Sequence, residues 1–157
     1  MNDDVVIDTN VMIHADNPND KFYHDSNNLL EILLEGDIKL CVDEGFDIDE
    51  SKNRSRIACE YYEHLRFGSL GYAVLQNLSI TMRIKFIDLK VDLNAKRKII
   101  RLIRNKRDRT FLIVAFNSIS RIFVSHDFED FSIKKRDKIR SDFGVKMFIA
   151  RDWNNLN

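Results

Sequence analysis

Proline, glycine and cysteine are scarce in this chain: its 157 residues include one proline, five glycines and two cysteines. With so few chain-breaking residues and no low-complexity run, no linker is indicated, and the length predicts a single domain over residues 1–157 with a proper hydrophobic core. Apolar stretches of about 18 residues are also missing, as are the basic and apolar segments of a signal peptide. We therefore expect a cytoplasmic protein with no membrane partner.

The two cysteines, Cys41 and Cys59, lie in an apolar and a helical stretch. Neither a Cys-x-x-Cys pair nor a Cys/His spacing typical of zinc sites occurs. Reduced thiols in the core are the favoured interpretation, and a disulfide between the two stays open.

The net charge of zero hides a strong segregation of charge. Residues 1–50 contain 14 Asp or Glu but only two Lys, whereas residues 83–109 contain 11 Lys or Arg and only three Asp. Such segregation indicates that one part of the surface holds cations and another attracts a polyanion. The alternative is a solvated surface whose charges balance in space.

Short apolar runs alternate with helical periodicities along the chain. Strands are predicted at residues 5–7, 38–42, 83–88, 121–124 and 145–149, the last of which closes the chain. Helices are predicted at residues 11–15, from Asp25 or Ser26 to Gly36, at 56–65, 72–78, from Asn94 to about 104, at 108–116 and 133–140, with a loop at 46–55. This alternation predicts an α/β fold, a parallel sheet with helices on both faces.

The first predicted strand ends directly in Asp8, within the run Val5-Val6-Ile7-Asp8-Thr9-Asn10. A carboxylate that follows a buried parallel strand lies at the edge where open α/β sheets bind ligands. The alternative is that Asp8 only caps the next helix, although Thr9 or Asn10 can serve as that cap instead.

Other carboxylates occupy matching positions. Asp127 follows the fourth predicted strand, Asp108 opens a buried apolar helix, and Glu60 lies on the helix after the second strand. Each alone is more often solvated or capping, but four at one sheet edge repel one another unless a cation lies between them. Carboxylate oxygens suit Mg²⁺ or Mn²⁺, whose bound waters can become nucleophiles.

Four segments, in this order, resemble the motifs of PIN-domain nucleases: Val5–Val11 with Ala15, Ile57–Leu65, Asp108–Ala115 and Ile122–Phe131. The resemblance spans about residues 5–150 and implies a three-layer α/β/α sandwich with a central, mostly parallel sheet. It also implies Mg²⁺- or Mn²⁺-dependent hydrolysis of phosphodiester bonds, most often by an endoribonuclease on single-stranded or structured RNA. Bacterial relatives of this type often serve as toxins or in defence systems, so a cognate inhibitor protein is a further expected partner, and a homodimer stays open.

By this match, Asp8, Asp108 and Asp127 bind one or two metal ions, and Glu60 completes the site or orients the attacking water. Asn10 and Ser125 are expected to be polar supports around these acids. The segment Asp43-Glu44 after the second strand competes with Glu60 for the second-acid role. No histidine is needed as a base, and His126 is expected to point away or into solvent.

Basic residues on and after the predicted helix at 94–104 are the candidate contacts to the nucleic-acid backbone. Three fall at i, i+4 and i+7, opposite the inward-facing Ile99, Ile100 and Ile103. Tyr61 and Tyr62 are candidates to stack on bases, with one of them in the core. The candidate phosphate contacts are Arg97, Arg101, Arg104, Lys106, Arg107 and Arg109.

Two rival functions compete with a nuclease. A haloacid-dehalogenase-type phosphatase also starts from an acid at a strand end, but it needs a second Asp two residues later, where this chain has Asn10. A non-catalytic module of the same fold that binds RNA or a protein stays open.

Overall fold

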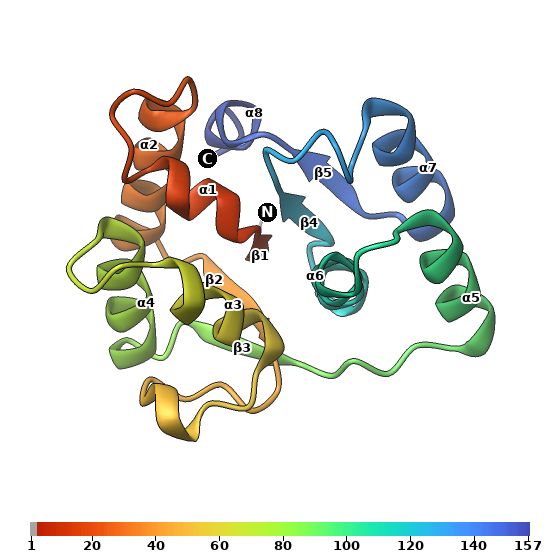
Figure 1. Ribbon diagram of the computed structural model, residues 1–157, viewed down its shortest axis with the longest axis horizontal. Helices are drawn as coiled ribbons and strands as arrows, with labels where there is room; N and C mark the ends of the chain where they lie inside the picture. The colour runs from red at the N-terminus through yellow and green to blue at the C-terminus, as the bar shows by residue number, and fades with distance from the viewer. Residues whose placement is uncertain (1–2) are drawn as a thin grey trace.

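The computed structural model describes residues 3–157 and has a five-stranded sheet between two layers of helices (Figure 1). Every strand pairing is parallel, in the order β3-β2-β1-β4-β5. The predicted three-layer α/β/α sandwich is confirmed, with a described sheet that is wholly parallel. The strands are β1 (Asp4–Ile7), β2 (Lys39–Asp43), β3 (Ile84–Ile87), β4 (Ile122–Val124) and β5 (Lys146–Phe148).

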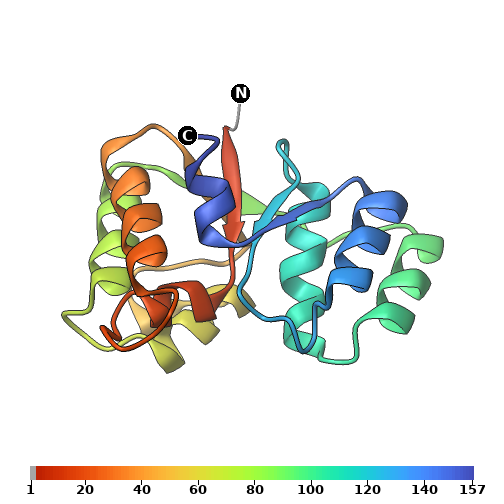
Figure 2. The same cartoon turned by 90° about the horizontal axis from the view of Figure 1, so that it is seen from above.

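Helices cover both faces of the sheet. Figures 1 and 2 show α2, α4 and α8 on one side and α5, α6 and α7 on the other. The helices are α1 (Thr9–His14), α2 (Tyr23–Glu35), α3 (Arg56–His64), α4 (Leu70–Ile80), α5 (Leu93–Leu102), α6 (Lys106–Asn117), α7 (Ile133–Phe143) and α8 (Ala150–Asn154), with a 3₁₀ turn η1 (Glu50–Lys52) in the predicted loop.

The strand order changes direction between β1 and β4. From β1 the chain builds outward through β2 to β3, and it then returns to place β4 and β5 on the other side of β1. Ligand sites of open α/β sheets form at such a switch point, outside the carboxyl ends of the strands. In Figure 2 the arrow of β1 points down toward this edge, and Figure 1 looks onto it.

The core explains why the short central strands are stable. All residues of β1 are buried. The ring of Phe123 in β4 stacks on that of Phe111 in α6, with 5.9 Å between ring centroids, and meets the ring of Phe131 edge-on, with 5.3 Å between centroids. On the other face, α2 and α8 pack together, with Trp153 of α8 fully buried. Buried aromatic side chains contribute more to such packing than any other residues, so both layers are fixed firmly to the sheet.

Several predicted boundaries differ from the structure. Helix α8 was not predicted, because its five residues show no period and their burial depends on Trp153. Helix α2 begins at Tyr23, before the predicted caps, and α5 is capped by Asp92, whose side chain accepts from the Ala95 amide, rather than by Asn94. Ile100 is 45% exposed rather than inward.

The two cysteines are free thiols, so they form no disulfide with each other. Cys41 of β2 is buried as predicted, whereas Cys59 is exposed on α3 rather than in the core. None of the described helices has the length and apolar character needed to cross a bilayer.

Candidate metal centre

Asp8 lies between β1 and α1, at the switch point of the sheet. Its amide donates to the Val124 carbonyl of β4, 2.9 Å away, which fixes it against the neighbouring strand. Asp8 occupies the N-cap position of α1, so Thr9 and Asn10, which lie within the helix, are not its cap. The Asp8 side chain, however, is 6% exposed and makes no capping hydrogen bond, so Asp8 does not serve only as a cap. Instead, Asp8 Oδ2 accepts hydrogen bonds from Ser125 Oγ at 2.7 Å and from Asn10 Nδ2 at 3.1 Å. The two residues expected to support the acids both hold Asp8.

The surroundings of Asp8 disfavour its charged form. Burial raises the pKa of its carboxyl to about 6, and the negative charges of Glu60 and Asp127 add to the rise. The hydrogen bond from Ser125 acts in the opposite direction without cancelling these effects. Asp8 is therefore a carboxylate that a bound cation would stabilise.

Asp127 lies in the loop that follows β4. Ser125 Oγ accepts from the Asp127 amide at 3.1 Å, so one hydroxyl links Asp127 to Asp8. Asp127 Oδ1 accepts from the amides of Glu129 and Asp130, at 2.9 and 3.0 Å, which closes a tight turn. This turn brings Asp130 back beside Asp127.

Asp108 occupies the first turn of α6, which Asn105 caps by accepting from the Arg107 amide. The Asp108 side chain is 7% exposed, and its Oδ2 is buried without a hydrogen-bond partner among the described residues. Burial raises the pKa of Asp108 far above its usual range; the negative charges of Asp8, Asp130 and Asp127 and a carboxyl–carboxyl hydrogen bond with Asp130 raise it further. A buried carboxylate oxygen without a donor is costly in a metal-free protein.

One oxygen each of Asp108, Asp127 and Asp130 lies within 4.8 Å of the others. Hard cations such as Mg²⁺ and Mn²⁺ take carboxylate oxygens as ligands. The Asp108 carboxyl fits such an ion, because it is buried and its Oδ2 has no other partner among the described residues. The three carboxylates are therefore suited to hold a divalent cation, with Asp8 close enough to influence their charge.

Glu60 is carried to the site by α3. The start of this helix is fixed by Asp43, which accepts from Ser55 Oγ at 2.6 Å and from the amides of Arg56 and Ile57 at 2.7 and 2.9 Å. The Tyr61 hydroxyl then donates to the Ile7 carbonyl at the end of β1. Glu60 is consequently held beside Asp8 and remains half-buried.

The competing acids after β2 lie elsewhere. Asp43 is 2% exposed and its two oxygens are occupied by the start of α3, which makes it a structural residue. Glu44 is exposed in the turn that follows. Of the acids near the second strand, Glu60 is the one whose charge acts on Asp8.

His126 is buried, so of its two expected placements the one in solvent is wrong; the other, pointing away from the acids, is consistent with its contacts to Phe22, His14 and Ala150. Its ring stacks on that of Phe22, with 4.0 Å between the ring centroids. Its Nε2 accepts a hydrogen bond from the Ala150 amide, and its Nδ1 lies 2.8 Å from His14 Nδ1. Burial and the neighbouring His14 lower the pKa of His126 to about 3. The histidine is a neutral structural link between the β4 loop, α1 and α8.

The two tyrosines of α3 are both structural. Tyr61 is fully buried, and Tyr62 is 8% exposed with its hydroxyl donating to the Asp47 carbonyl at 2.7 Å. Neither presents a ring face to a base, so the stacking interpretation is wrong.

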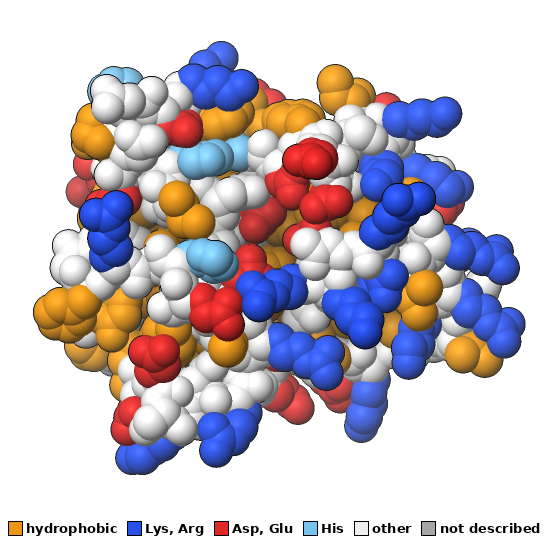
Figure 3. Space-filling model, viewed as in Figure 1, with side chains coloured by type: hydrophobic (Ala, Val, Ile, Leu, Met, Phe, Trp, Pro, Cys, Tyr) orange, Lys and Arg blue, Asp and Glu red, His pale blue; other side chains and the backbone are white. Residues whose placement is uncertain are grey.

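The predicted basic contacts fall into two groups. Arg97, Arg101, Arg104 and Lys106 are exposed, although Arg104 lies beyond the end of α5. By contrast, Arg109 Nε donates to the Ile103 carbonyl at 2.6 Å, so this guanidinium stabilises the end of α5. Arg107 pairs with Glu63 of α3 at 3.0 Å. Figure 3 shows acidic side chains gathered at the centre of this face and Lys and Arg side chains beside them.

Two residues of the site were not identified from the sequence. Asp130 has a local signal, the Asp-x-x-Asp spacing with Asp127 in a segment that follows a strand. Arg136 of α7 has none: its guanidinium donates to the carbonyls of Phe131, Ser125 and Asp127 at 2.8 to 3.0 Å. One half-buried cation thereby fixes the shape of the acidic loop.

The chain matches none of the models of known protein families and none of the curated proteins with which it was compared.

Proposed function

We propose that this protein is a Mg²⁺- or Mn²⁺-dependent nuclease, most simply an endoribonuclease that hydrolyses phosphodiester bonds in single-stranded or structured RNA. Two observations on the buried Asp108 carboxyl carry the proposal: its Oδ2 has no hydrogen-bond partner among the described residues, and one of its oxygens lies within 4.8 Å of oxygens of Asp127 and Asp130, at the switch point of a parallel sheet. The resemblance of four sequence segments to the motifs of PIN-domain nucleases supports the same chemistry. That family includes bacterial toxins and defence proteins.

Asp108, Asp127 and Asp130 would hold the cation, with Asp8 as a further ligand directly or through water. A divalent ion in such a site lowers the pKa of a coordinated water and stabilises charge on the phosphate. The oxygen-only donor set favours Mg²⁺ or Mn²⁺ over zinc, which prefers nitrogen and sulfur ligands.

The protein's own residues orient the reaction. Ser125 and Asn10 fix the Asp8 carboxylate, and Ser125 also holds the Asp127 backbone, so these two acids keep a constant relative position. Glu60 is half-buried beside Asp8 and is the group placed to orient a water and accept its proton. The His126 Nε2 lone pair is already used by the Ala150 amide, so a carboxylate rather than a histidine serves as base.

A cleavage assay on mixed single- and double-stranded RNA and DNA tests this proposal. We expect cleavage in Mn²⁺ or Mg²⁺, none in excess EDTA, and none by Asp8→Asn or Asp108→Asn in either metal. Asp137→Asn, an exposed acid of α7, is the matched control and should cleave like the wild type. Full activity in chelator or in both site variants would refute a metal-dependent nuclease, and RNA binding without cleavage would favour the non-catalytic module.

A further inference from the structure

A cavity of about 400 Å³ lies between α3 and α6, next to the acidic centre. Its volume is within the range of roughly 300–1,000 Å³ that is usual for small-molecule sites. Glu60 forms part of its wall and also raises the pKa of Asp8, so cavity and acids are neighbours. We propose that this cavity binds one nucleotide of the RNA strand adjacent to the scissile phosphate, an inference that rests on the proposed function.

The rim of the cavity is cationic. Arg54, Arg56, Lys106 and Arg107 line it, against Glu60 and Glu63. Arg107 is already paired with Glu63, whereas among residues 3–157 the other three cations form no ion pair. All three are exposed. The cavity therefore carries unmatched positive charge, which complements the phosphate of a nucleotide.

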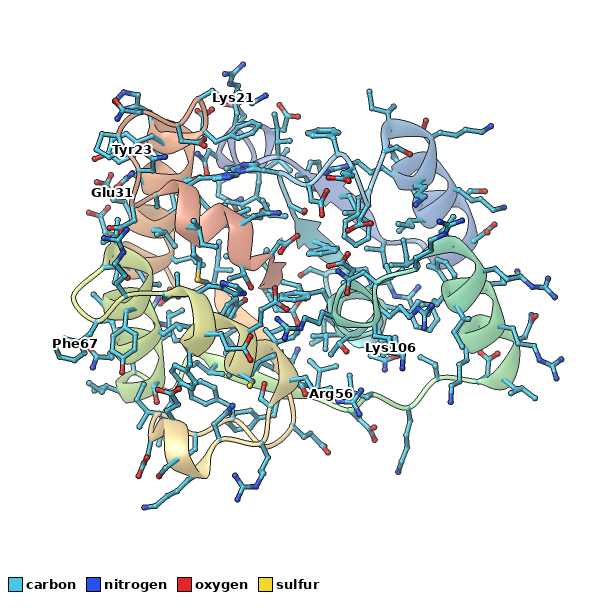
Figure 4. The ribbon with its side chains drawn as sticks, in the orientation of Figure 1. Lys21, Tyr23, Glu31, Arg56, Phe67 and Lys106 are labelled. Carbon is cyan, nitrogen blue, oxygen red and sulfur yellow. The ribbon has the colours of Figure 1, made fainter. Side chains whose placement is uncertain are left out.

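The rim side chains, rather than a helix end, supply this attraction. The first amides of α3 are already taken, by Asp43 and by the Ser55 hydroxyl. In Figure 4, Arg56 lies at the start of α3 and Lys106 at the start of α6, and both line the cavity. Two helices thus bring their cations to one place.

The inner wall of the cavity is apolar. Ile57 of α3 and Phe111 of α6, each 1% exposed, close its floor, and both belong to the hydrophobic core. An apolar interior with a cationic rim suits a ligand that is flat and apolar at one end and anionic at the other. A nucleobase with its phosphate has this character, whereas free phosphate or sulfate fills only the rim.

Cys59 provides a direct probe, because it also lines the cavity and is exposed while Cys41 is buried. Alkylation of Cys59 by uncharged iodoacetamide, followed by mass spectrometry in EDTA, should slow when a single-stranded RNA decamer is added. If binding blocks the thiol, the rate falls about tenfold at an RNA concentration ten times the Kd. An abasic phosphodiester of the same length should protect less. Cys41 should stay unmodified throughout, which shows that the fold is intact.

The variants Arg54→Gln/Arg56→Gln and, separately, Lys106→Gln should need more RNA for the same protection. The matched control is Lys39→Gln/Lys146→Gln, which removes two exposed cations at the amino ends of β2 and β5, the opposite edge of the sheet. Unchanged protection in the cavity variants, or equal loss in the control, would overturn the assignment.

Three further outcomes also overturn it. These are no protection by RNA, equal protection by the abasic oligomer, and protection by polyglutamate instead of RNA, which would indicate an acidic protein partner. Since the measurement needs no turnover, it separates the two proposals. RNA that is cleaved in Mn²⁺ without protecting Cys59 refutes the cavity alone. RNA that protects Cys59 but is never cleaved refutes the nuclease, and with it the position next to a scissile phosphate, and leaves only RNA binding in the cavity.

Discussion

Replacing Asp8 by Asn should stabilise the metal-free protein. The folded state holds the Asp8 proton more tightly than the unfolded chain, because burial and the nearby charges raise the pKa from 3.8 to about 6. Above pH 3.8 the carboxyl ionises in the unfolded chain but not yet in the folded protein, and this lowers the free energy of the unfolded state. The free energy of unfolding therefore falls as pH rises toward 6, and it falls no further on account of Asp8 above that pH. Asn keeps the shape, its oxygen can accept from Ser125 and Asn10, and it carries no charge.

The size of the gain follows from the two pKa values. They differ by about two, and each unit corresponds to about 1.4 kcal/mol, so the charged carboxylate costs about 3 kcal/mol at pH 8. For a domain of this length, that difference corresponds to a Tm increase of about 6–12 °C. At pH 5 the gain should shrink to about half, because the folded carboxyl is then mostly protonated.

Thermal unfolding at pH 8 and pH 5, in EDTA and in a Mn²⁺ series, measures these effects. In EDTA, Asp8→Asn should melt higher than the wild type. In Mn²⁺ the wild type should rise with metal concentration, since an ion that binds only the folded state stabilises it, and the variant should rise less. Asp137→Asn should match the wild type within about 0.5 kcal/mol. An Asp8→Asn protein that melts lower in EDTA at pH 8 would refute the reasoning.

Three more perturbations separate the remaining roles. Glu60→Gln should abolish cleavage, whereas Glu44→Gln, in an exposed turn, should leave most of it; the reverse result would transfer the second-acid role to the turn. His126→Gln should make the free energy of unfolding fall less between pH 7.5 and pH 5 than in the wild type. With a folded pKa of about 3, His126 stays neutral in the folded protein while the unfolded chain takes up a proton, which costs the wild type about 2 kcal/mol over this range. An equal fall in stability in both proteins would contradict this. Replacing Arg97, Arg101 and Arg104 together by Gln should flatten the slope of log RNA affinity against log salt concentration by roughly two, at about 0.7 per phosphate contact. An unchanged slope would show that these arginines only solubilise the helix.

The features that the sequence predicted well are those encoded locally. Two short apolar runs, one followed by Asp8 and the other by Ser125 and Asp127, need only strand propensity to be recognised. A parallel fold then brings the two strand ends to one edge, and the structure places them on adjacent strands.

The features that could not be predicted depend on distant partners. Arg136 is indistinguishable in sequence from the other cations of α7 until the carbonyls of the β4 loop are in place. Arg109 was expected on RNA because nothing local shows that the end of α5 lies beside it. His126, Tyr62 and Asp43 were misjudged or left undecided for the same reason, since burial is decided by the elements that pack on them.

The hydrogen bond from Ser125 to Asp8 joins residues 117 positions apart, and this spacing sets when the acidic centre can form during synthesis. A ribosome adds about 5–20 residues per second, so Ser125 is made roughly 6–23 s after Asp8. Throughout that interval β1 lacks its neighbour on one side, and Asp8 lacks its strongest hydrogen bond. A nascent or prematurely terminated chain that stops before β4 has no assembled acidic centre, so the centre can form only after β4 and the loop that carries Asp127 have been made.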